Sequence, residues 1–163
     1  MNGENVSASR GFTLVELLIV IAILGILANI VIPVVMGQVR RAQAASIIED
    51  FLIFRTALFE YYRDYSEFPR DYYPGREPKD LRDYLDGRIR WSQPQWQLNI
   101  KYDWDNWKRK DGRPKHKRTG VLYGFSVTTE NEELIEAIKK TYSGPFWYTL
   151  GNNYTFVIEP ISP

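Results

Sequence analysis

Residues 12–36 read FTLVELLIVIAILGILANIVIPVVM, and this apolar run decides how the rest of the chain can be organised. Within it, Glu16 and Asn29 are the only strongly polar side chains. A hydrocarbon core about 30 Å thick needs about 20 mostly apolar residues in a helix. The sequence therefore predicts one membrane-spanning helix, with the span at about residues 14–36.

Two simpler interpretations of the run are a secretory signal peptide and a plain membrane anchor. A signal peptide has an apolar region of only about 7–15 residues. A cleavage site near Ala28 is also disfavoured, because Ile26 stands where a small residue is preferred. A plain anchor fits the length, but its orientation is not settled by charge. Arg10 lies before the run, and Arg40 and Arg41 follow it.

Glu16 is the feature that a plain anchor does not need. A carboxylate inside an apolar helix costs a few kcal/mol on insertion, so such residues usually have a function. If the chain is cut after Gly11, a positive amine appears at Phe12, four residues before Glu16. The amine and the carboxylate can then neutralise each other, within one helix or between neighbours. A carboxylate that reaches water at the headgroup level is an equally good interpretation.

The start of the apolar run resembles a known processing signal. Residues 10–16, RGFTLVE, followed by aliphatic side chains, are similar to the signal of type IV prepilins and type II secretion pseudopilins. Pro33 also falls at an interior position that this family favours. The resemblance covers residues 10–40 and is specific within that part of the chain.

The resemblance implies a role for each residue at the junction. Residues 1–11 would be a leader peptide, removed by a dedicated membrane peptidase between Gly11 and Phe12. Phe12 would become the N-methylated start of the mature chain. Glu16 would be the carboxylate used in assembly.

The resemblance also implies where the protein acts and with what. The chain would sit in the bacterial inner membrane as a single-pass protein with its head in the periplasm, and would then join a periplasmic or extracellular filament. The implied partners are a prepilin peptidase, other pilin or pseudopilin subunits, an assembly ATPase and an inner-membrane platform protein. Many major pilins close a loop with a disulfide, and this chain has no cysteine. We therefore favour a pseudopilin or minor pilin.

This prediction is of a structural subunit and not of an enzyme. The alternative from another class is a membrane-tethered module that binds DNA or a surface ligand and forms no filament. The only histidine, His116, has no Ser or Cys partner pattern, so no catalytic residue is assigned.

The helix is expected to continue beyond the membrane to about residue 65, which gives a helix over residues 12–65. Apolar side chains recur there at steps of three and four residues. They are Ile47, Ile48, Phe51, Leu52, Leu58, Phe59 and Tyr62. Gly25 and Pro33 are predicted to break or kink the helix, because Pro33 cannot donate to the carbonyl of Asn29. The Asn29 side chain is expected to bond a neighbouring helix or to cap the freed carbonyls.

Residues 66–163 are predicted to form a compact head. Alternating apolar residues and turn signals predict strands at 98–104, 121–127, 146–150 and 154–158, and Pro78 and Gly87 bracket a short helix. A capping box of Thr129 and Glu132 predicts a further helix that ends at Gly144. The predicted fold class is α+β: a long protruding N-terminal helix packed against a small antiparallel sheet of about four strands. The pilin resemblance implies the same arrangement.

Two segments of the head are candidate binding sites. Asp103, Asp105 and Asn106 offer oxygen ligands that calcium prefers, although the usual calcium-loop spacing is missing. A strand end with a polar turn is the alternative, and no other cofactor is predicted.

A basic stretch follows this acidic one, next to Trp104 and Trp107. Its cations are Lys108, Arg109, Lys110, Arg113, Lys115, Lys117 and Arg118. Cations with aromatic neighbours can bind nucleic acid through phosphate contact and base stacking. A solvated loop between two strands is the alternative.

Overall fold

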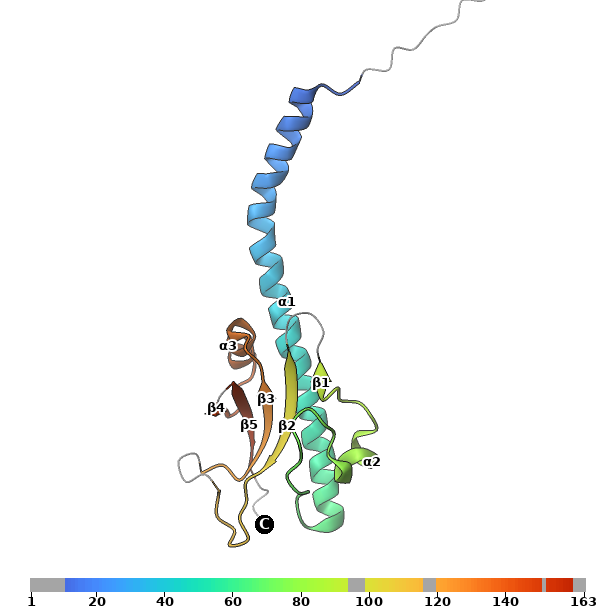
Figure 1. The fold of residues 1–163 in the computed structure, drawn as a ribbon, viewed down its shortest axis with the longest axis vertical. Coiled ribbons are helices and arrows are strands. Elements are labelled where there is room, and N and C mark those ends of the chain that lie inside the picture. Colours follow the sequence, from blue (N-terminus) through green and yellow to red (C-terminus); the bar gives the residue numbers. More distant parts are fainter. Residues whose placement is uncertain (1–10, 94–98, 116–119, 151, 160–163) are drawn as a thin grey trace, which may run out of the picture. The chain divides into compact units, whose positions relative to one another are not determined.

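A computed structural model describes residues 11–93, 99–115, 120–150 and 152–159 (Figure 1). The chain divides into two compact units, Met1–Val39 and Arg40–Pro163. Helix α1 (Leu14–Tyr65) contributes to both units, so its two parts are described separately.

The part of α1 in the first unit is apolar on every side. All its side chains up to Val39 are exposed, from Leu14 at 79% to Val39 at 41%. By length and composition this helix can cross a membrane. An exposed surface of this kind is unfavourable in water, at about 25 cal/mol for each Å² of apolar area, so it requires an apolar environment.

The part of α1 in the second unit buries one stripe. The stripe follows a spacing of three and four residues, as expected for a helix with a single apolar face. It consists of Ala44, Ile47, Phe51, Phe54, Ala57 and Leu58. The prediction missed Phe54 and was wrong for Leu52, which is 48% exposed. The Phe51 ring stacks on Phe156 with centroids 4.5 Å apart.

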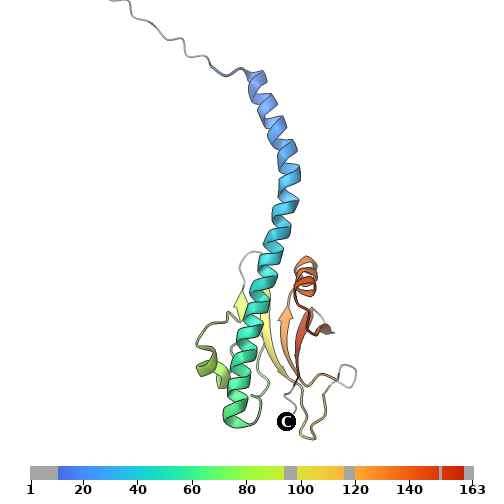
Figure 2. The same ribbon diagram turned by 180° about the vertical axis from the view of Figure 1, so that it is seen from behind.

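A five-stranded antiparallel sheet lies against this stripe (Figures 1 and 2). The strands are β1 (Ser92–Gln93), β2 (Ile100–Asn106), β3 (Tyr123–Thr128), β4 (Phe146–Leu150) and β5 (Asn153–Ile158), in the order β1-β2-β3-β5-β4. The predicted α+β class is confirmed. About four strands were expected, and the additional one, β1, is too short to show alternation in the sequence. Leu98, expected at the start of a strand, lies outside the described residues.

The two faces of the sheet differ because successive side chains of a strand point to opposite sides. Tyr102 and Trp104 of β2 are fully buried in the core, on the α1 side, together with Phe125 and Val127 of β3. Asp103, between the first two, belongs to the opposite face. The candidate calcium ligands are therefore divided between the two faces.

The helices of the head agree only partly with the prediction. A 3₁₀ turn, η1 (Lys79–Leu81), and α2 (Arg82–Leu85) form the short helix expected between Pro78 and Gly87. Helix α3 (Glu132–Thr141) begins at another cap than predicted, since the Asn131 side chain accepts the Leu134 N–H at 3.0 Å. It ends at Thr141, three residues before the predicted stop.

Candidate assembly site and surfaces of the head

The start of α1 holds Glu16 in a reciprocal capping box with Thr13. Glu16 Oε2 accepts the Thr13 N–H at 2.9 Å and the Thr13 hydroxyl at 2.7 Å. The Thr13 hydroxyl oxygen accepts the Glu16 N–H at 3.2 Å. Two N–H groups without a helical partner are thereby satisfied. Sequence analysis did not identify this box, although the spacing Thr-x-x-Glu is its usual signature.

The box places the carboxylate next to the predicted cleavage junction. Phe12 immediately precedes Thr13, and its side chain is 83% exposed. A Cβ atom added at Gly11 would meet no atom of the described structure within 4 Å. Gly11 is thus not required for packing within this chain. A requirement for glycine at this position would have to come from another molecule that binds the chain there.

Gly25 and Pro33, the two predicted breaks, lie within the uninterrupted helix α1. Pro33 removes one helical hydrogen bond, and the turns on either side retain theirs. The Asn29 side chain donates to the Gly25 carbonyl of its own helix at 2.9 Å. The Asn29 side chain therefore does not cap the carbonyl that Pro33 leaves free, because that carbonyl belongs to Asn29 itself. In this single chain it also bonds no neighbouring helix.

The three candidate calcium ligands do not converge. The Asn106 side chain donates to the Pro69 carbonyl at 2.8 Å and accepts the Lys108 N–H, so its amide is already engaged. Asp105 instead accepts a hydrogen bond from Ser126. Among the described residues, no three acidic or histidine side chains come together around a possible metal position.

Asp103 and Asp105 are half-buried carboxylates on the sheet face away from α1. Burial, together with the charges of Asp105 and Asp71, raises the pKa of Asp103 to about 8, and burial is the largest of these causes. One oxygen of Asp103 is buried without a hydrogen-bond partner. Burial also raises the pKa of Asp105 to about 6, against the hydrogen bond from Ser126, which lowers it. Ionising Asp103 or Asp105 therefore costs free energy in the folded head.

The basic stretch forms a hairpin that extends β2 and β3 beyond the sheet. Lys108 pairs with Pro114 in an isolated bridge, and the Arg109 carbonyl accepts the Gly112 N–H at 2.9 Å. The Arg109 N–H donates to the Arg113 carbonyl at 2.8 Å. The cations of residues 108–115 are all exposed. His116, Lys117 and Arg118 lie outside the described residues.

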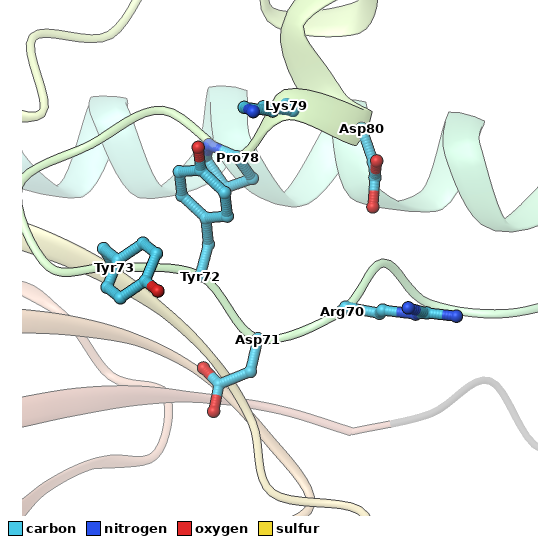
Figure 3. A pocket seen from close by; sticks show the side chains of 7 residues that line it. All are labelled: Arg70, Asp71, Tyr72, Tyr73, Pro78, Lys79 and Asp80. Carbon is cyan, nitrogen blue, oxygen red and sulfur yellow. The ribbon is translucent and has the colours of Figure 1, made fainter.

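A hollow of about 490 Å³ opens between residues 70–73 and the start of η1 (Figure 3). Its lining residues are Arg70, Asp71, Tyr72, Tyr73, Pro78, Lys79 and Asp80. Figure 3 shows the side chains of Tyr72 and Pro78 among those that line the hollow. Two cations and two carboxylates line the hollow together, so it does not favour an ion of either sign.

Comparison with known proteins locates the chain's similarity at its N-terminal motif. Residues 6–31 match the model of the prokaryotic N-terminal methylation motif. Among curated proteins, a type II secretion system core protein G of Klebsiella michiganensis is 40% identical over 62 residues, which are 38% of this chain and 44% of the relative. A protein of the same name from Pectobacterium carotovorum is 37% identical over 67 residues, 41% of this chain and 43% of the relative.

A type IV major pilin protein of Neisseria gonorrhoeae is 42% identical over 62 residues, 38% of this chain and 37% of the relative. Each match thus spans less than half of the relative's length, and no solved structure matches the chain. These names describe structural or secretion proteins, in agreement with the prediction that the chain is not an enzyme. The chain carries the prokaryotic N-terminal methylation motif and is similar, over about two-fifths of its length, to type II secretion core protein G and type IV pilin.

Proposed function

We propose that this protein is a structural subunit of a type IV pilus-like or type II secretion pseudopilus filament, assembled through its N-terminal helix. The observation that carries the proposal is the part of α1 up to Val39, which is apolar on all sides and exposed along its whole length. Before assembly, a lipid bilayer supplies the apolar environment that such a helix requires. A bundle of identical helices from neighbouring subunits satisfies it equally well, because both environments are apolar.

Processing at the motif creates the group that Glu16 needs. We propose that a prepilin peptidase cuts between Gly11 and Phe12 and that Phe12 is then N-methylated. In the uncut chain, Thr13 satisfies the Glu16 carboxylate. After the cut, the new amine lies next to this box and can neutralise a carboxylate of its own or of a neighbouring helix. A buried carboxylate without a positive partner is costly, so this pairing would select the correct register.

The remaining elements of the proposal are those that the resemblance to prepilins implies. Before assembly the protein is stored in the bacterial inner membrane with its head in the periplasm. Other pilin or pseudopilin subunits, an assembly ATPase and a platform protein of the inner membrane complete the system. The helix is uninterrupted at Gly25 and Pro33 in the single chain, and these positions are where we propose that it yields during extraction from the bilayer.

The test is assembly of Glu16→Ala in the native host or a reconstituted system. We expect membrane levels near wild type and a loss of sheared filaments in electron micrographs. Glu49→Ala, at an exposed position of the same helix, is the matched control and should assemble. Filaments of Glu16→Ala at wild-type yield would contradict the role proposed for Glu16, whereas a wild-type protein that forms no filaments would favour a membrane-tethered binding module.

A further inference from the structure

The basic hairpin, residues 107–115, is a built surface of the head that the proposed function does not use. Its backbone is fixed by the bonds described above and by the Lys115 N–H, which donates to the Trp107 carbonyl at 2.7 Å. Lys115 also pairs with Asp71 at 3.5 Å. Within the described part of the chain, Lys108, Arg109, Lys110 and Arg113 form no ion pair. Exposed cations on a fixed hairpin are free to meet an external partner.

Four carboxylates gather around the start of α3. They are Glu130, Glu132, Glu133 and Glu136, all exposed. Glu133 bonds Arg40 at 3.1 Å and Glu136 bonds Lys139 at 2.8 Å. Two of the four, Glu130 and Glu132, have no ion pair among the described residues. We call these four residues the acidic end of the head.

The hairpin and the acidic end lie at opposite ends of the sheet. Asn106 pairs with Tyr123 at the hairpin end, and Lys101 pairs with Thr128 at the other, where α3 follows. At about 3.3 Å per residue, the six residues of β3 separate the two ends by about 17–20 Å. Figure 1 shows α3 near one end of the strands and the hairpin that directly follows β2 near the other end. The two charged surfaces therefore cannot pair within one head.

We propose that the basic hairpin of one copy docks on the acidic end of the next copy. The inference rests on the proposed filament function and adds a contact between heads to the contact between helices. The chain as a whole is almost neutral, with a formal net charge of +1, yet these charges are segregated to opposite ends. A polyanion would use only the basic end. A second copy of the chain uses both.

The geometry of this contact also favours a filament. It joins two different surfaces in a head-to-tail manner, and contacts of this kind extend into open arrays unless a rotation closes them. Single exposed ion pairs contribute little and are screened by salt. Several ion pairs acting together determine the register and orientation of two neighbouring heads more than they determine the affinity between them.

Cysteine cross-linking tests the contact directly, because the native chain has no cysteine. The full-length protein carrying both Lys110→Cys and Glu132→Cys is oxidised in native membranes and in detergent at low salt. We expect a ladder of oligomers. Each single variant should stop at dimers, and Lys110→Cys with Glu60→Cys, at an exposed position of α1, should give no ladder.

Charge reversal gives a second and independent readout. Lys108→Glu with Arg109→Glu, and separately Glu130→Lys with Glu132→Lys, should each reduce filament yield by about tenfold. All four changes in one chain should restore it, and so should mixing the two reversed proteins, which then alternate. The inference would be overturned if neither charge reversal lowered the filament yield. It would also be overturned if the combined variant did not restore the yield.

Two further outcomes separate this inference from its alternatives. Wild-type filaments without a cross-linked ladder would overturn the contact and leave the filament function intact. Absence of filaments together with absence of a ladder in detergent would overturn both. Duplex DNA retained by the wild-type protein and lost on reversal of the hairpin, with assembly unchanged, would assign the hairpin to nucleic acid instead.

Discussion

The phenolic hydroxyl of Tyr102 donates a 2.7 Å hydrogen bond to Oδ2 of Asp50, and so joins strand β2 to helix α1 within the head. Burial raises the pKa of Asp50, and the hydrogen bond from Tyr102 opposes that rise. Burial and the nearby Asp50 charge raise the pKa of Tyr102. The pair is a polar contact at the boundary of a core that is otherwise aromatic and aliphatic.

Tyr102→Phe should lower the free energy of unfolding by about 1–3 kcal/mol, because it leaves a half-buried carboxylate without its donor. Urea unfolding of the full chain in detergent, at neutral pH, measures this difference. Tyr73→Phe is the control, since the Tyr73 side chain is 69% exposed and should unfold like wild type. Equal stability of the two variants would contradict the role of this hydrogen bond.

The head should be more stable in mild acid than in mild alkali. The pKa of Asp103 is raised from 3.8 to about 8 on folding, and that of Asp105 to about 6. A raised pKa means that the folded state binds protons more tightly than the unfolded state. The stabilisation is therefore complete below pH about 4 and is lost as the pH rises towards about 8.

Asp103→Asn should remove most of this pH dependence. At pH 9 the variant should exceed wild type by about 1–3 kcal/mol, because no buried charge has to form, and at pH 4 the two should be alike. Thermal unfolding across this range is the measurement, with the exposed Asp83→Asn as the control. Wild-type stability that is level between pH 5 and pH 9 would refute this account.

Gly124 of β3 is required by its neighbours on β5. A Cβ added there would clash with Cγ2 of Thr155 and would lie 3.3 Å from the Trp107 ring. Gly124→Ala should therefore cost about 1–3 kcal/mol of stability through overpacking. Thr155→Ser removes the clashing methyl group and keeps the hydroxyl that bonds Ser126 at 2.8 Å. The double variant should recover most of the loss in a denaturant titration, and failure to recover would locate the strain elsewhere.

Gly11 should be needed for processing and not for folding. A Cβ at Gly11 meets nothing in the described structure within 4 Å, and Gly11 lies outside the unit that contains the head, so Gly11→Leu should leave the head's thermal unfolding unchanged. Cleavage by a prepilin peptidase should be abolished in the same variant. Gly37→Ala is the matched control, because Gly37 is equally unhindered and lies outside residues 6–31, which match the motif. Normal cleavage of Gly11→Leu would place the junction at another residue.

Periodicity in the sequence was sufficient to predict the long helix, the fold class and most strands, because each depends on a repeat over many residues. It did not resolve which neighbouring apolar residue faces the sheet. Leu52 and Phe54 are both apolar and close in sequence, and only the register of α1 against β2 and β3 buries Phe54, whose ring contacts Trp104 and Phe125. Strand β1 has two residues, which is too few for any repeat.

The hydrogen bonds that cap the helices were harder to predict than the helices themselves. Thr129 and Asn131 are both good helix caps, and the structure selects Asn131 since its side chain reaches the Leu134 N–H. Thr13 and Glu16 carried a capping signature, but Glu16 was interpreted only as an assembly carboxylate or as a carboxylate that reaches water at the headgroup level. The raised pKa of Asp103 depends on its burial in the folded head and on the charge of Asp71, which is distant in sequence, and no local pattern reveals either.

The central claim is that the chain is cut at its motif and enters a filament, and the most direct test is its N-terminus. Intact mass and N-terminal sequencing of the protein isolated from its native membranes measure this. The account predicts a chain that begins at N-methylated Phe12. A chain that still begins at Met1, or one cut near Ala28, would contradict it and leave a tethered or secreted binding domain.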